Sequence, residues 1–175
     1  MGAGASYIGA QNGIVLCVDE RTAERTEARI YHAYTEKEIH VNGVEEMAAA
    51  MDDFFDRLGF PFPGTKDETF FPDGRNRTDK RQQERMVRVL KDEDLLKEHG
   101  DAGTFIIRVQ HRQHSSWQGM VSWVEEDRTV PFRSALELIK MIDEALNDGG
   151  NEPDCNSLVK NQEKRVNNGS GGIQE

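Results

Sequence analysis

Hydrophobic positions along the chain follow two different periods, and the change from one to the other marks the expected elements. Short apolar runs and alternating apolar positions at residues 13–20, 27–34 and 37–41 predict three strands. From Gly43 onward the apolar residues recur at spacings of three and four, which is one face of a helix. Gly59 is a suitable residue to end that helix, because glycine tolerates the left-handed conformation common after a last turn.

The same order of patterns returns in the second half of the chain. Strands are expected at residues 104–111, 119–126 and 128–132. Ser134 is a favourable helix N-cap, and Glu137 three residues later completes a capping-box pattern. The helix that follows is expected to end at Gly149–Gly150.

The two halves superpose without a gap at an offset of 91 residues. Strand residues Ile14, Leu16 and Val18 fall on Phe105, Ile107 and Val109, and helix residues Met47, Met51 and Phe55 fall on Leu138, Ile142 and Leu146. The identities are Val18/Val109, Arg21/Arg112, Glu46/Glu137 and Asp52/Asp143. This correspondence favours a duplicated βββα unit. The alternative is chance, because any two such segments of similar length would align.

These patterns predict an α+β fold of two tandem βββα units, in which an antiparallel sheet carries helices on one face. A lone unit of this size buries too little surface, so the two units are expected to share one core. The expected divisions are a flexible N-terminus at 1–12, units at 13–59 and 101–148, a Pro- and Phe-rich loop with a linker helix at 60–100, and a disordered tail at 149–175. The linker helix is expected to start at Thr78 or Asp79 and to end at Gly100.

Composition and charge narrow the classes of function. The 175 residues carry a formal charge of −10, which disfavours general binding to nucleic acid. No run approaches the roughly 20 apolar residues that a membrane span needs. Cys17 and Cys155 lie 138 positions apart, so neither a disulfide framework nor a cysteine metal site is expected. These features predict a cytoplasmic protein that is not bound to a membrane.

The stretch RVQHRQHSSWQG at residues 108–119 is the first candidate site. If Ile107 and Val109 face the core, strand alternation places the next polar side chains in a row on the other face, about 6.5–7 Å apart. The candidate ligand-binding residues are Arg108, Gln110, Arg112, His114, Ser116 and Trp117. Two arginines in a row can hold a phosphate or carboxylate, which a tryptophan from the hairpin loop could close over. The alternative is a solvated sheet face followed by a polar turn.

A basic segment at residues 75–91 is the second candidate, with seven Lys or Arg against two acidic residues. Its proposed contacts to an acidic partner are Arg75, Arg77, Lys80, Arg81, Arg85 and Arg88. The alternative is a solvated helix paired with the acidic first half of the same chain. His111 and His114 point to opposite faces of a strand, so no metal site is expected.

Residues 104–147 also carry a recognisable pattern, W-x-G at Trp117-Gln118-Gly119 and F-R-S-x-x-E-L-I at Phe132 to Ile139. In this pattern the segment resembles a recurrent kind of small bacterial protein of unknown function. The resemblance covers about a quarter of the chain and implies a strand–strand–helix arrangement. It implies no activity.

Three functions are compatible with the sequence. The first is a non-enzymatic interaction or regulatory protein with a protein partner and a possible homodimer, and with no catalytic residue, metal or cofactor. The second is a nucleic-acid-binding accessory protein that uses a βββα sheet and the basic segment 75–91. The third is an enzyme or a nucleotide- or phosphate-binding protein that uses the stretch from Arg108 to Trp117.

Overall fold

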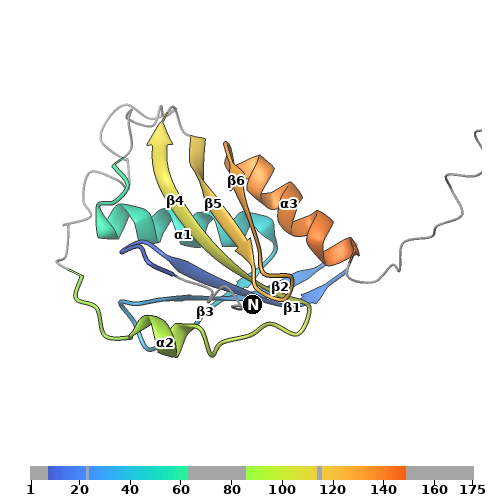
Figure 1. The fold of residues 1–175 in the computed structure, drawn as a ribbon, viewed down its shortest axis with the longest axis horizontal. Coiled ribbons are helices and arrows are strands. Elements are labelled where there is room, and N and C mark those ends of the chain that lie inside the picture. The colour runs from blue at the N-terminus through green and yellow to red at the C-terminus, as the bar shows by residue number, and fades with distance from the viewer. Residues whose placement is uncertain (1–7, 23, 63–85, 114–115, 149–175) are drawn as a thin grey trace, which may run out of the picture.

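The computed structural model describes residues 8–22, 24–62, 86–113 and 116–148 and shows an α+β fold (Figure 1). Its elements, in chain order, are β1 (Ile14–Arg21), β2 (Thr26–His32), β3 (Ile39–Asn42), α1 (Val44–Leu58), α2 (Asp92–Leu95), β4 (Gly103–Gln113), β5 (Ser116–Trp123), β6 (Arg128–Phe132) and α3 (Ala135–Asp148). The strands form one antiparallel six-stranded sheet in the order β3-β2-β1-β4-β5-β6. The predicted α+β class and antiparallel sheet are therefore confirmed.

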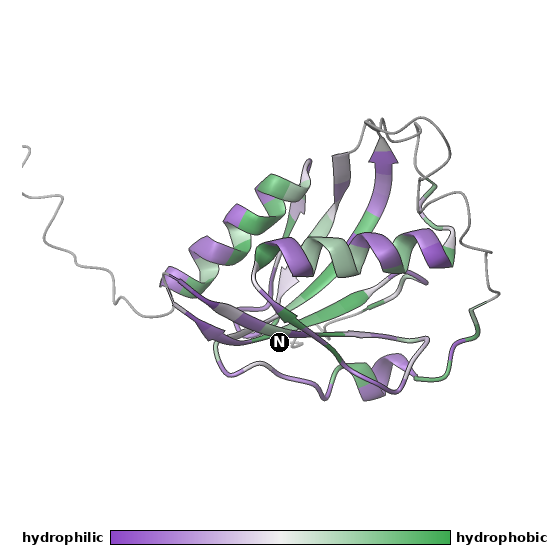
Figure 2. Cartoon of the chain, turned by 180° about the vertical axis from the view of Figure 1, so that it is seen from behind, coloured by the Kyte–Doolittle hydropathy of each residue, from purple (hydrophilic) through white to green (hydrophobic). Residues whose placement is uncertain are grey.

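The two faces of the sheet are covered differently. Ile14, Leu16 and Ile107 belong to the larger apolar cluster, which α1 and α3 complete. Val15 and Ile106 point the other way, as alternation along a strand requires, and pack in a smaller cluster with Leu95 of α2. Figure 2 shows hydrophobic residues along the central strands, while both long helices alternate between hydrophobic and hydrophilic residues.

Local chemistry sets the ends of the long helices. Gly59 follows α1 in the left-handed conformation, with φ 67°, as its position predicts. At the start of α3 the Ser134 hydroxyl accepts a hydrogen bond from the Glu137 amide at 3.0 Å. The Glu137 carboxylate accepts one from the Arg133 amide at 2.6 Å, one residue before the amide expected for a capping box.

The two halves of the sheet share one register at the offset of 91 residues. In β1 and β2, Leu16 pairs with Ile30, and in β4 and β5 the corresponding Ile107 pairs with Val121. The β1–β2 and β4–β5 ladders also have an irregularity at corresponding places. It lies between Val18 and Glu20 in β1 and between Val109 and His111 in β4. At the centre Val15 pairs with Ile106, and these two residues are themselves separated by 91 positions. The pairing is therefore symmetric about Val15 and Ile106. A two-fold axis through this pair would superpose each paired residue of β1 on the residue of β4 that lies 91 positions later.

Residues 86–100 do not form the linker helix that the sequence predicts. Only Asp92–Leu95 is helical, and residues 86–89 have no regular secondary structure. The amides of Val89 and Leu90 donate to the Ala33 carbonyl at 2.7 and 3.0 Å, so the segment bonds to the end of β2 instead of to itself. These bonds to Ala33 take the place of the intrahelical bonds that the amides of Val89 and Leu90 would otherwise make.

In the described part of the segment expected to be a flexible N-terminus, Ile8 and Asn12 are both 1% exposed. The start of the linker helix before residue 86 and the predicted disordered tail at 149–175 lie outside the described residues.

Candidate functional site

A β-bulge in β4 separates the arginines of the first candidate site. Val109 pairs with Gly119 and His111 with Gln118, so Gln110 is the extra residue on its strand. Beyond an extra residue the alternation reverses, and Arg112 lies on the same face as Val109. The predicted row of Arg108, Gln110 and Arg112 on one face is therefore wrong.

Arg112 is instead part of the core side of the sheet. Its guanidinium donates to Asp56 of α1 at 2.5 Å, lies 3.6 Å from the Asp52 carboxylate, and sits 5.9 Å from the centre of the Phe55 ring. The residue is 6% exposed. Trp117 is also buried, edge-on to Phe55 at 5.5 Å, and so does not close over a hairpin loop. Arg112 and Trp117, two of the residues predicted to bind a ligand, therefore contact α1 instead.

The remaining residues of the stretch do not converge either. Arg108 is half-buried on the opposite face, while Gln110 and His111 are exposed. Ser116 belongs to β5 instead of the hairpin loop, and its hydroxyl donates to the Arg133 carbonyl at 3.0 Å. His114 lies outside the described residues. The face of the sheet that carries Arg108 therefore fits the alternative of a solvated sheet face better than it fits a ligand-binding row.

Arg21 of β1 repeats the role of Arg112 in the first half of the chain. Its guanidinium binds Asp143 of α3, with its Nε 3.0 Å from the carboxylate, and donates to the Thr26 hydroxyl at 2.7 Å. Arg21 and Arg112, like Asp143 and Asp52, are separated by 91 residues. Each arginine thus reaches the helix of the other half.

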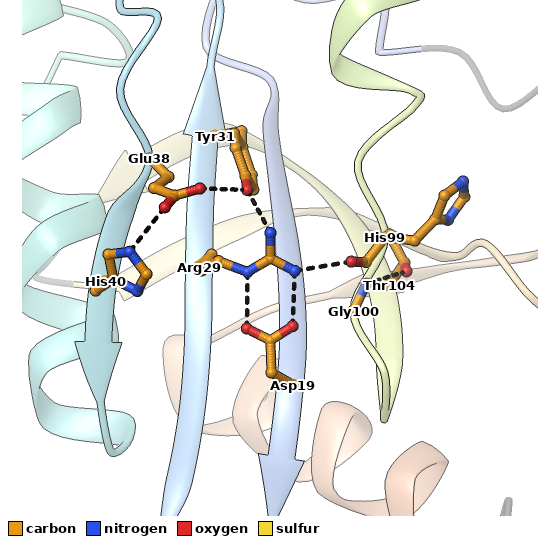
Figure 3. A network of polar contacts seen from close by, with 8 residues as sticks. All are labelled: Asp19, Arg29, Tyr31, Glu38, His40, His99, Gly100 and Thr104. Atoms are coloured by element: carbon orange, nitrogen blue, oxygen red, sulfur yellow. Dashed lines mark hydrogen bonds and ion pairs between the residues drawn. The ribbon is translucent and has the colours of Figure 1, made fainter.

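A polar network covers the opposite face of β1 and β2 (Figure 3). Arg29 donates twice to Asp19, at 2.7 Å in each case, once to the Tyr31 hydroxyl at 2.6 Å, and once to the His99 carbonyl at 2.9 Å. Tyr31 in turn donates to Glu38 at 2.8 Å. The network ties the segment before β4 to the sheet.

The main charged groups of this network, Arg29 and Asp19, are paired with each other. Hydrogen bonding from Arg29 holds the pKa of Asp19 below its ordinary value, and burial followed by the bond to Glu38 raises the pKa of Tyr31. Nearby, burial raises the pKa of the Cys17 thiol to about 12, so the thiol stays protonated. An open depression of about 490 Å³ lies beside Asp19 and Arg29, but its central guanidinium and carboxylate already bind each other. This arrangement suits a structural role.

His32 at the end of β2 packs against the inner face of α1. Its ring stacks on Phe54 with centroids 4.2 Å apart and planes 9° from parallel. Burial, and secondarily the nearby Arg57, lower the pKa of His32 to about 4. The imidazole is therefore neutral in the folded protein and fills the space between the strand and the helix.

A half-open pocket of about 180 Å³ lies between α3 and the strands β4, β5 and β6. Phe105, Trp123 and Val130 line its sheet side, Ala145 its helix side, and Arg128 and Glu144 its rim. The Trp123 indole N–H is buried and has no hydrogen-bond partner among the described residues. The pocket combines an apolar lining with two charged groups, which is the usual make-up of a small-molecule site.

No protein-family model, curated protein or solved structure matches the chain. Sequence reasoning missed the pocket, although the aligned halves carry a signal for it, because Ala145 falls on Phe54.

The basic candidate patch is only partly described. Arg75, Arg77, Lys80, Arg81 and Arg85 lie outside the described residues, and Arg88 forms an ion pair with Asp92. Among the residues that the structure describes, no three His, Cys, Asp or Glu side chains gather as a metal site would require. Within the same ranges, no helix has the length and apolar character needed to cross a membrane.

Proposed function

We propose that the chain is a duplicated βββα unit whose two copies face each other across the β1–β4 pairing. The shared register and the corresponding bulges support this interpretation. The four identities at the offset of 91 add chemical support, because three of them have matched roles. Arg21 and Arg112 bind Asp143 and Asp52 reciprocally, and Glu46 accepts from the Asn42 amide at 2.8 Å as Glu137 does from Arg133.

We propose that this scaffold is a non-enzymatic interaction or regulatory module that works by binding a ligand between α3 and the sheet. The observation that carries the proposal is a difference between the two copies. In the first copy, the Phe54 ring of α1 fills the space between the helix and the sheet. At the corresponding place in the second copy, α3 has Ala145 and a half-open pocket remains. Phe105, which corresponds to Ile14, returns a ring to this half, yet the pocket remains beside it, and an open site kept in one copy favours a binding role.

Methyl NMR on the full chain tests this function. The methyl groups of Val121, Val130, Met141 and Ala145 line the pocket and report on its occupancy. With a panel of metabolites and cell-extract fractions, we expect saturable shifts at these methyls and recovery of the bound molecule unchanged by mass spectrometry. Chemical conversion of the bound molecule would contradict the non-enzymatic role, and a panel that leaves all four methyls unmoved would contradict the binding role.

A protein partner, the possible homodimer and a cytoplasmic location stay part of the proposal. The protonated, buried thiol of Cys17 is compatible with a reducing compartment. A salt-dependent shift of DNA or RNA mobility in the presence of the protein would favour the nucleic-acid alternative instead. The resemblance of residues 104–147 to small bacterial proteins remains a prediction.

A further inference from the structure

We infer that the pocket beside Trp123 takes a free small molecule with one flat aromatic ring and a polar group at the ring's edge. This inference rests on the proposed binding function and names the class of ligand. It comes from a comparison of the pocket with the corresponding place in the first half of the chain.

The first half shows what the space between strand and helix holds. At the offset of 91 residues, Trp123 corresponds to His32 and Ala145 corresponds to Phe54. In the first half the Phe54 ring lies flat on the His32 ring, 4.2 Å away and 9° from parallel. The second half keeps a larger flat ring on the strand and replaces the helix ring with a methyl group. The second half also has the Phe105 ring where the first half has Ile14, and the pocket lies beside this ring and Trp123. A pocket lined by two stacked rings suits a further planar ring.

The volume of the pocket agrees with this comparison. Its space of about 180 Å³ is close to that of a cavity of about 150 Å³ that takes up benzene in another protein. A ring stacked on the indole would also continue the existing pair of Trp123 and Phe105, whose planes lie 23° from parallel.

The polar groups define the rest of the ligand. The Trp123 indole N–H is buried out of reach of the pocket's open space, so the charged groups at the rim are the polar groups that a ligand would meet. Arg128 and Glu144 place one positive and one negative group at the rim, which suits a neutral or zwitterionic molecule better than a strongly anionic one.

The surroundings favour a small molecule over a docked protein. The rim residues Arg128 and Glu144 and the neighbouring Thr129 are exposed and polar. Stable protein interfaces usually bury more than about 1,000 Å² around a central apolar pocket. A pocket of one ring with a polar rim matches a fragment-sized ligand instead.

The test compares two probes that share an acceptor and differ in planarity, benzamide and cyclohexanecarboxamide. In the full chain carrying Trp117→Phe, Trp123 is the remaining tryptophan, so its fluorescence and its indole N–H signal report on the pocket directly. We expect benzamide to shift the indole signal and to bind roughly three- to tenfold more tightly than the saturated probe, the range that aromatic stacking supports.

Three variants localise the effect. Ala145→Phe places a ring where the first half already holds one and is expected to abolish benzamide binding while the melting temperature is kept or raised. Trp123→Phe keeps a ring but offers a smaller face for stacking, so the affinity for benzamide should fall. Leu136→Ala lies on the exposed side of the same helix, 60% exposed, and should leave binding unchanged.

The outcomes separate the ligand class from the proposed function. Equal binding of the two probes, or undiminished binding to Trp123→Phe, would overturn the inference even if Ala145→Phe fails to fold. If the pocket methyls respond to aliphatic metabolites but not to benzamide, the aromatic class is wrong and the binding function stands. If nothing shifts the methyls or the indole, both are wrong.

Discussion

At the scale of single residues, Arg112 has the most consequential environment. A guanidinium that is 6% exposed needs paired carboxylates, because an unpaired buried charge is strongly destabilising. Asp52 and Asp56 provide these charges from α1, and Phe55 packs against the guanidinium group. Arg112 therefore fastens α1 to the sheet.

Replacing Arg112 with Met is expected to lower the free energy of unfolding by about 3 kcal/mol, because the change leaves two carboxylates facing a buried apolar group. Arg21→Met is the matched control in the other half. Arg21 and Asp143 are 28% and 41% exposed, so solvent screens their pair, and a loss of about 1 kcal/mol is expected. Urea denaturation measures both values, and equal losses would contradict this account.

His32 is expected to make stability depend on pH. Its pKa is about 4 when folded and 6.5 as an ordinary value, so the folded state prefers the neutral ring. Stability should be full above pH 6.5 and should fall as the pH drops toward 4, because the unfolded chain takes up the proton first. The loss should reach roughly 3 kcal/mol at most.

The control for this prediction is His32→Phe, which keeps a stacked ring against Phe54 and removes the titrating group. Denaturant unfolding across the same pH range should show a flatter stability profile for the variant. A profile with an unchanged slope would assign the pH dependence to other groups.

At the scale of elements, local capping chemistry predicts helix ends well. Ser134, Glu137 and Gly59 all act within one turn of the helix end, where only near neighbours matter. The failure at residues 86–100 has the opposite cause. That segment buries Leu95 and bonds to Ala33, which lies more than fifty positions earlier in the chain, so its own periodicity was a poor guide.

Removing the cap of α3 provides a test at this scale. Ser134→Ala is expected to cost about 1 kcal/mol, because the Glu137 amide loses its acceptor. Ser134→Asp keeps an acceptor and adds a charge that suits a helix N-terminus, so its stability should match the original protein. Thermal unfolding of the two variants distinguishes them, and an equal loss in both would assign the effect to packing.

At the scale of the whole molecule, the two halves share one core. The larger apolar cluster contains residues of β1, β2 and α1 together with residues of β4, β5 and α3. The centre of the sheet, where β1 pairs with β4, is also the boundary between the proposed copies. Neither half can therefore hide its apolar face without the other.

A protease site inserted between residues 70 and 80 tests this dependence. After cleavage, we expect the two fragments to elute as one species and to melt in one transition, because the β1–β4 ladder and the common core join them. The uncleaved insertion variant is the control. Separate elution, or two independent transitions, would show that the halves are stable apart.

The amino-acid sequence by itself determined the order of the six strands and the two long helices, the helix caps and the correspondence at 91 residues. These features depend on spacing and on neighbours within about one helical turn, so they can be read without coordinates. Only the tertiary structure decided which face Arg112 occupies, because a single bulge at Gln110 reverses every side chain beyond it. It also decided that Arg29 is fully engaged and that a ring-sized space remains beside Trp123. Both depend on contacts between distant parts of the chain, and a void has no residue of its own to mark it.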